Sequence, residues 1–175
     1  MKYIKNIKKY PIQGLIEIEL NPYSDPRGQI WSIYEECDML PTFVEDKVTI
    51  SNKGVLRGLH GDFETDKLIC CMHGDLFLSV ADIRRESNTF KETQTFYLSD
   101  DNPTMVLVPA GCLNGHLCLS DKCIFFYKWS EKYKQPDDQI TVLWSDPELS
   151  IPWPTDAPIL SERDSRAKIL REMEV

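Results

Sequence analysis

His60 and Lys67 lie seven positions apart between runs that are typical of β-strands. Histidine changes its charge near neutral pH, and a lysine ammonium can stabilise a developing negative charge. The stretch 54–84 therefore predicts a small titratable cluster on the wall of a β-sheet. Each residue also has a plainer interpretation: a hydrogen-bonded core histidine, and a solvated lysine at the start of a strand.

Tyr127 and Arg27 are two further candidates, each with a structural alternative. In the run FFYKW, strand alternation places Tyr127 on the face opposite Phe126 and Lys128. A buried tyrosine hydroxyl more often makes a structural hydrogen bond than acts as an acid. Arg27 belongs to the turn sequence DPRG, where an arginine is expected in solvent.

A metal site fits the sequence poorly. The three histidines, His60, His73 and His116, are scattered, and no H-x-H or C-x-x-C spacing occurs. We therefore expect neither a bound metal nor another cofactor.

Alternating and apolar runs indicate the elements that must position these residues. The predicted strands are 14–20, 29–34, 43–51, 55–60, 66–72, 75–83, 93–98, 105–108, 114–119, 123–129 and 139–144. Residues 161–174 are predicted to be helical, with Ser161 as the N-cap. Short strands at close spacing with little helix predict an all-β sandwich or barrel, formed by residues 1–175 as a single domain.

Composition limits the classes of partner. The chain has 175 residues and a formal net charge of −8, which argues against a broad nucleic-acid or membrane surface. Nothing resembles a signal peptide or a membrane span, so we expect a cytoplasmic protein with reduced cysteines. Four of the six cysteines lie in apolar runs and are expected to be buried: Cys70, Cys71, Cys118 and Cys123.

Several motifs together resemble one known family. They are SNKGVLRGLH (51–60), DKL (66–68), GDLFLSVADIRRESNTF (74–90), LVPAG (107–111), FYK (126–128), WSDPELSIPWP (144–154) and LSERD (160–164). In this order and spacing the chain is similar to the nucleotide-sugar 3,5-epimerases typified by dTDP-4-dehydrorhamnose 3,5-epimerase. The resemblance implies a metal-free cupin jelly roll that forms a homodimer and acts on a nucleotide-diphosphate sugar.

The resemblance also implies roles for individual residues. His60 would be the general base beside the 4-keto group, Asp164 would orient it, and Tyr127 would be the acid on the opposite face of the sugar. Lys67 would stabilise the enolate oxygen. The residues expected to bind substrate are Arg27, Arg57, Asn114, Ser32, Lys47, Glu45 and His116.

The chain departs from the family pattern around this expected site. The usual histidine of a GFAHGF-like turn is Asn114, the usual aspartate of the FDV strand is Leu78, and RGLHYQ becomes RGLHGD with Gly61. Glu45, Lys47 and Thr49 replace a Q-x-N-x-S pattern, and Ser32 replaces a glutamate. These changes predict a different nucleotide or sugar, or inversion at C3 alone, and Gly61 is consistent with a bulkier 4-keto heptose.

Two other functions stay open from the sequence. A nucleotide-sugar 3,4-ketoisomerase would move the carbonyl from C4 to C3, whereas an epimerase would exchange hydrogen at C3, C5 or both. A non-catalytic jelly roll that binds a sugar nucleotide would exchange none. The retained His60, Lys67, Tyr127 and Asp164 favour the epimerase.

Overall fold

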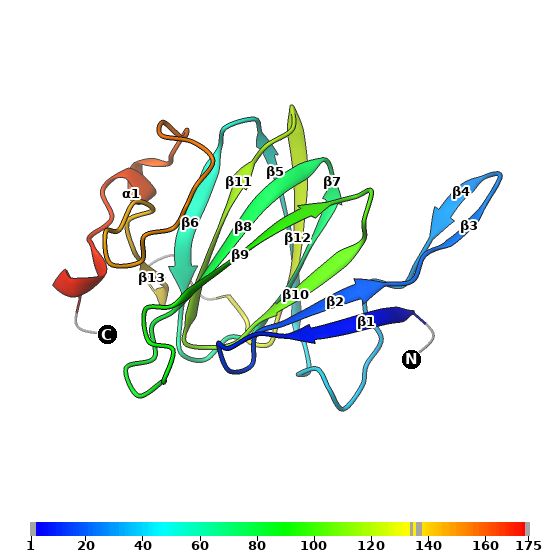
Figure 1. Ribbon diagram of the computed structural model, residues 1–175, viewed down its shortest axis with the longest axis horizontal. Helices are drawn as coiled ribbons and strands as arrows, with labels where there is room; N and C mark the ends of the chain where they lie inside the picture. Colours follow the sequence, from blue (N-terminus) through cyan, green and yellow to red (C-terminus); the bar gives the residue numbers. More distant parts are fainter. Residues whose placement is uncertain (1–2, 134, 136–137, 174–175) are drawn as a thin grey trace.

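The structure is a computed structural model that describes residues 3–133, 135 and 138–173. Two antiparallel β-sheets face each other, and the short helix α1 (Glu162–Ser165) lies beside one of them (Figure 1). This arrangement confirms the predicted all-β sandwich. Within the described residues, no helix has the length and apolar character needed to cross a bilayer.

The strand order defines the two walls of the sandwich. The six-stranded sheet has the order β1 (Ile4–Lys9), β2 (Ile16–Leu20), β10 (Thr104–Val108), β7 (Lys67–His73), β12 (Lys122–Trp129) and β5 (Glu45–Asn52). The five-stranded sheet has the order β13 (Ile140–Thr141), β6 (Leu56–Gly61), β11 (Cys112–Cys118), β8 (Asp75–Asp82) and β9 (Thr93–Ser99). A separate hairpin joins β3 (Tyr23–Asp25) to β4 (Gly28–Ile30).

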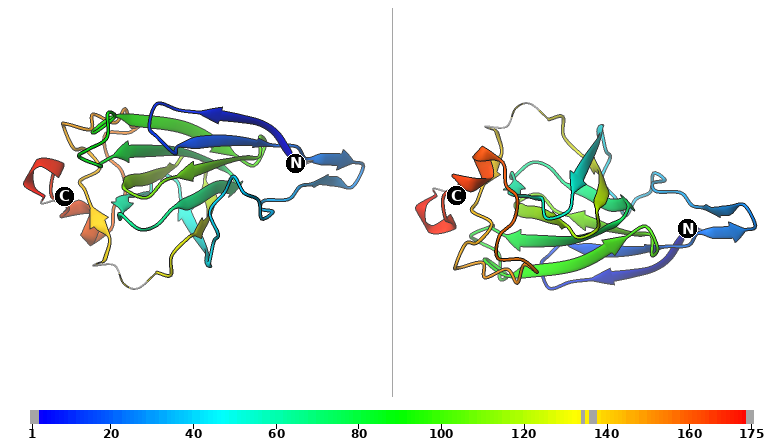
Figure 2. Two further views of the ribbon diagram at one scale, coloured as in Figure 1. Left: turned by 90° about the horizontal axis from the view of Figure 1, so that it is seen from below. Right: turned by 90° about the horizontal axis from the view of Figure 1, so that it is seen from above.

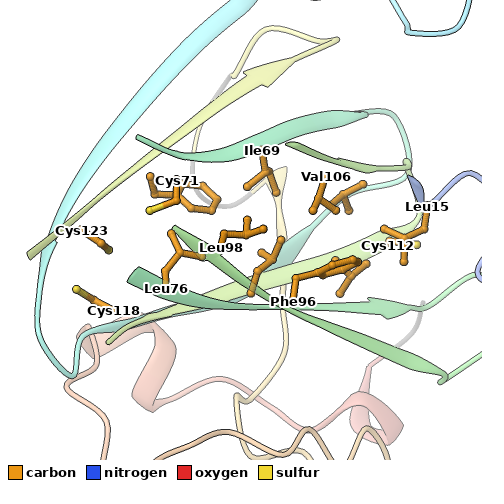
Figure 3. Packing of buried hydrophobic residues seen from close by; sticks show 14 of the residues in the cluster. Leu15, Ile69, Cys71, Leu76, Phe96, Leu98, Val106, Cys112, Cys118 and Cys123 are labelled. Atoms are coloured by element: carbon orange, nitrogen blue, oxygen red, sulfur yellow. The ribbon is translucent and has the colours of Figure 1, made fainter. Parts of the chain in front are cut away.

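Apolar side chains fill the space between the sheets over part of its length. Ile69 and Val106 come from one sheet, Leu76 and Phe96 from the other, and all four lie in one buried cluster (Figure 3). Their burial supplies the main driving force for the sandwich. All six cysteines are free thiols, and the predicted burial of Cys70, Cys71, Cys118 and Cys123 is confirmed.

Irregular chain covers part of the outer face of each sheet. Trp31, Ile33 and Tyr34 pack on the six-stranded sheet, so the predicted strand 29–34 ends at Ile30 and continues as a loop. Val142 and Leu170 belong to a cluster on the outer side of the five-stranded sheet. The C-terminal segment therefore completes the domain by packing beside β6 and β13 (Figure 1).

Two C-terminal predictions need correction. The predicted strand 139–144 shortens to Ile140–Thr141, and the helix predicted from Ser161 ends at Ser165, with a 3₁₀ turn following at Leu170–Glu172. The Leu143 N–H donates to the Lys168 carbonyl over 2.9 Å, so the chain after α1 pairs with the residues that follow β13 in place of continuing the helix. Residue 174, within the predicted helix, lies outside the described residues.

The N-terminal segment forms a strand that its basic, proline-interrupted sequence does not reveal. β1 pairs antiparallel with β2 of the same chain, with Ile7 opposite Ile18. The β3–β4 hairpin projects beyond the sheets, and the described ends of the chain lie at opposite ends of the long axis (Figure 2).

The motif DIRRESNTF owes its composition to a buried carboxylate. Asp82 has a fully buried side chain and accepts hydrogen bonds from Arg84, Ser87 and Thr89 at 2.6–2.8 Å. Burial tends to raise the pKa of Asp82, but these donors, led by Arg84, outweigh it and lower the pKa to about 2. The loop after β8 is thus held in place by hydrogen bonds to one ionised carboxylate.

Replacing Asp82 should destabilise the protein strongly. We expect Asp82→Ala to cost about 3 kcal/mol, because Arg84 loses its partner and buried hydroxyls lose their acceptor. The stabilisation should be complete above the unfolded-state pKa of about 4 and be lost as pH falls through about 2. Urea unfolding measures it, with the exposed Asp101→Ala as control; equal midpoints for the two variants would contradict this account.

Candidate active site

A cavity of about 560 Å³ opens between the sheets beside the apolar core. Along β12, the inward residue Cys123 belongs to the core, Phe125 borders both regions, and Tyr127 and Trp129 line the cavity. β6 and β11 provide the opposing wall, and the segment around α1 closes one side. The cavity thus receives side chains from both sheets and from the C-terminal segment.

His60 and Asp164 form a hydrogen-bonded pair in this cavity. His60 Nε2 lies 2.7 Å from Asp164 Oδ1, and the Asp164 side chain is 4% exposed. A carboxylate only accepts hydrogen bonds, so Nε2 carries the hydrogen and Nδ1 keeps its lone pair. Nδ1 has no hydrogen-bond partner among the described residues, which leaves it available as a base.

The local fold keeps Asp164 ionised. Ser161 caps α1 by accepting a hydrogen bond from the Asp164 N–H, as the sequence predicts, and this turn sets the carboxylate against β6. Burial tends to raise the pKa of Asp164, but the bond from His60, helped by Ser161 and the Gly58 N–H, outweighs it and lowers the pKa. An ionised carboxylate stabilises the imidazolium that forms when His60 takes a proton.

A β-bulge on β6 brings Arg57 and His60 into the same cavity. Asn114 pairs with His60 and His116 pairs with Arg57, so two residues of β6 oppose one residue of β11 between these pairs. Regular alternation would put positions 57 and 60 on opposite faces. Gly58 and Gly115 permit the close approach, because a Cβ on Gly58 would lie 2.5 Å from the Gly115 Cα.

Lys67 is buried in the wall opposite β6. Only 3% of this residue is exposed, and its ammonium donates to Asn114 Oδ1 at 3.1 Å and to the His60 carbonyl at 3.3 Å. Desolvation lowers the pKa of Lys67 to about 8, although Asp62 opposes this effect. The interpretation of Lys67 as a solvated residue is therefore wrong. Its ammonium lies at a buried position where desolvation disfavours the charged form.

Tyr127 faces the same cavity from β12. Its hydroxyl has no hydrogen-bond partner among the described residues, so the interpretation as a structural hydrogen bond finds no support. Desolvation raises the pKa of Tyr127, with Arg57 opposing, so the phenol is protonated at neutral pH. Base and phenol therefore come from opposite sheets and share one cavity.

Three of the remaining residues predicted to bind substrate also line the cavity. Asn114 accepts a hydrogen bond from Lys67, and His116 stacks on Phe125 with ring centroids 4.0 Å apart. Desolvation lowers the pKa of His116 to about 3, so its imidazole is neutral. The Lys47 ammonium lies 3.3 Å from the Tyr133 ring centroid and 4.3 Å from the Trp129 ring centroid.

Three other predicted residues do not line the cavity. Glu45 lies just outside it, where it pairs with Lys47 at 3.6 Å and accepts a hydrogen bond from the Tyr133 N–H. Arg27 is exposed on the β3–β4 hairpin and pairs with Asp25. Ser32 is exposed in the loop that follows this hairpin.

Sequence reasoning missed several residues that line the cavity. Trp129 and Phe125 share a face with Tyr127 by strand alternation, so this signal was present in FFYKW. Tyr133, Gln139 and Arg163 come from loops and from the C-terminal segment, where no periodic pattern marks them. Within the described residues, no group of three His, Cys, Asp or Glu side chains could hold a metal ion.

Two of the departures from the family pattern lie outside the cavity wall. Leu78 is fully buried in the apolar core. Gly61 packs against β11, where an added Cβ would lie 2.3 Å from the Cys112 carbonyl oxygen. A glycine at this position therefore serves strand packing, and it gives no support to the expectation of a bulkier heptose.

Comparisons with known proteins agree with the motifs. The family model for dTDP-4-dehydrorhamnose 3,5-epimerase matches residues 9–172. An enzyme of that name from Methanothermobacter thermautotrophicus is 37% identical over 174 residues, with 94% of each chain covered. The fold matches dTDP-6-deoxy-D-glucose-3,5-epimerase from Legionella pneumophila in complex with dTDP-4-keto-L-rhamnose, at 32% identity and a TM-score of 0.88, covering 95% of this chain and 93% of that one.

A second solved structure differs in the outcome that its name states. It is ChmJ, a 3′-monoepimerase from Streptomyces bikiniensis in complex with dTDP-quinovose, with 29% identity and a TM-score of 0.84, covering 90% of this chain and 84% of that one. The fold and the matched length agree with these relatives. The chain belongs to the dTDP-4-dehydrorhamnose 3,5-epimerase family.

Proposed function

We propose that this protein epimerises a nucleotide-linked 4-keto-6-deoxy sugar at C3, at C5 or at both. The observation that carries the proposal is one cavity with the His60–Asp164 pair on one wall and the protonated Tyr127 on the other. Inversion of a carbon centre needs a base on one face and a proton donor on the other. The two sheets supply one each.

The reaction needs only proton transfers. The 4-keto group acidifies the neighbouring C–H bonds, and Nδ1 of His60 takes the proton while the electron pair moves onto the keto oxygen. Lys67 stabilises the resulting enolate. The enolate collapses to the ketone as carbon takes the Tyr127 hydroxyl proton on the opposite face, and both side chains then recover their proton states by exchange with water.

The family supports a dTDP-linked substrate. The Legionella enzyme is named as a complex with dTDP-4-keto-L-rhamnose, and ChmJ as a complex with dTDP-quinovose. In this chain Arg57 lines the cavity and is suited to a diphosphate, because a guanidinium binds phosphate oxygens in a planar fork. We propose that Arg57 holds the diphosphate and that Lys47 and His116 contact substrate from the walls.

Deuterium exchange tests this function directly. The protein is incubated with dTDP-4-keto-6-deoxyglucose in D2O, and proton NMR and mass spectrometry follow C3 and C5. Deuterium at C3, at C5 or at both positions, with inverted configuration, is the expected result. No exchange at either position would overturn the proposal, and a carbonyl that moves from C4 to C3 would identify a ketoisomerase.

We also propose a homodimer. β5 is an edge strand, and its outward residues Val48 and Ile50 are 60% and 62% exposed. Exposed apolar edges favour pairing or cover by another chain. Arg27 does not line the cavity of its own chain, and we propose that its hairpin reaches the cavity of a partner. Light scattering after gel filtration should give twice the mass of one chain.

The rate of the enolising step should fall as pH rises through about 8. Lys67 has its pKa lowered to about 8, so its ammonium is present below that pH and is lost above it. We expect a single descending limb near pH 8 in the turnover rate at saturating substrate. Lys67→Gln should be slow and lack this limb, whereas Lys128→Gln, on the outer face, should keep it. A limb that persists in Lys67→Gln would assign it to another group.

A further inference from the structure

Asn114 is bound to Lys67 in a way that fixes the orientation of its amide. Lys67 Nζ lies 3.1 Å from Asn114 Oδ1, and an ammonium can only donate hydrogen bonds. The amide oxygen must therefore face the lysine. The amide nitrogen, Nδ2, is consequently the group that Asn114 turns away from Lys67.

The free end of this amide meets the cavity. Asn114 is 8% exposed and lines the cavity, and Nδ2 has no acceptor among the described residues. Nδ2 is also not one of the fully enclosed side-chain atoms that lack a partner. Its hydrogens are therefore open to whatever occupies the cavity.

Lys67 has one ammonium N–H that can also donate into the cavity. Two of its three hydrogens go to Asn114 Oδ1 and to the His60 carbonyl. Asn114 also lies directly opposite His60 in the β6–β11 pairing, next to the base. The remaining ammonium hydrogen and the Asn114 amide thus stand side by side near the point where the proton leaves carbon.

We propose that Lys67 and the Asn114 amide form a two-donor site for the 4-keto oxygen, which becomes the enolate oxygen. The inference rests on the proposed function and makes Asn114 a catalytic residue. Two preorganised donors stabilise an oxyanion more than one does, because neither must reorient when the charge develops. The amide does not titrate, so its donor stays available at every working pH.

Two variants of Asn114 distinguish the loss of the hydrogen-bond donor from a change in side-chain shape. Asn114→Asp keeps the size and removes the donor, and Asn114→Leu removes all polarity. We expect each to slow exchange about 100-fold, the effect typical of a lost oxyanion donor. Where the wild type exchanges both C3 and C5, the two rates should fall by the same factor, because both enolates share one oxygen. Asn6→Asp, exposed on β1, should keep the wild-type rate.

A pH profile adds a readout that a merely structural role would not move. The charged groups that act on Lys67 are Asp62 and Lys47, and His60 lies beside it. A carboxylate in Asn114→Asp adds a negative partner, so the descending limb should move above pH 8. Binding of dTDP should change little in either variant, because the sugar oxygen is absent from this probe.

The outcomes of the two proposals can be told apart. Wild-type exchange rates in both variants would overturn the role of Asn114 and leave the epimerase proposal intact. A slow Asn114→Asp variant with an unmoved pH limb would also overturn it. A wild-type protein that shows no exchange would instead refute the proposed function, and the two-donor site with it.

Discussion

His60→Asn should lower the rate of deuterium incorporation from D2O by about 1,000-fold or more. General-base catalysis contributes about 100- to 10,000-fold, and no other described group in the cavity pairs a free imidazole nitrogen with a carboxylate. Asparagine is chosen because its amide can still donate to Asp164. The buried carboxylate then keeps a partner, and the fold should survive.

A matched control exists on the surface. His73 Nδ1 lies 3.0 Å from Asp100 Oδ2, so the chain contains a second histidine–aspartate pair, exposed and far from the cavity lining. His73→Asn should leave exchange unchanged. If His60→Asn exchanged at more than a tenth of the wild-type rate while dTDP binding was normal, His60 would not be the base.

The Asp164→Asn variant tests the second member of the pair. Its amide can present either oxygen or nitrogen to His60, so the orientation of the imidazole and its hydrogen position are no longer fixed. We expect a loss smaller than that of His60→Asn. The unfolding midpoint should be measured alongside, because Asp164 is buried and also accepts from the Gly58 N–H at 3.5 Å.

Regular strands could be predicted from sequence because burial imposes a period of two. β8, β9 and β12 match their predicted bounds within one residue, since each alternates or is continuously apolar between turn residues. The sequence pattern did not predict β1, because its exposed face is rich in lysine and only Ile4 and Ile7 are partly buried. The helix predicted from Ser161 begins there as expected but ends at Ser165, because tertiary contacts of the following residues outweigh local propensity.

The candidate site depended on features that period-two patterns do not encode. The bulge in β6 is what allows Arg57 and His60 to face one cavity, and alternation alone would separate them. The sequence pattern of Lys67 is that of a surface residue, and only the fold brings its acceptors together: the His60 carbonyl on β6 and the Asn114 amide on the distant strand β11. Residue types and spacing predict His60 and Lys67 as a titratable cluster, whereas Arg57 and Asp164 follow only from the resemblance.

Tyr127→Phe should separate exchange from inversion. With the hydroxyl gone, His60 can still remove the proton and return deuterium to the same face of the carbon. Product of inverted configuration should fall by about 100-fold or more, because its proton donor is lost. Deuterium should still enter the recovered substrate at a rate close to that of the wild type.

This uncoupling follows from the placement of the two groups on opposite sheets. A tyrosine that served only to support the cavity wall would slow exchange and inversion together when changed. Tyr97→Phe, on the exposed side of β9, is the matched control and should alter neither rate. Chiral analysis of product and deuterium content of residual substrate, measured in one reaction, gives both rates. Equal losses in the two rates would remove Tyr127 from the role of acid.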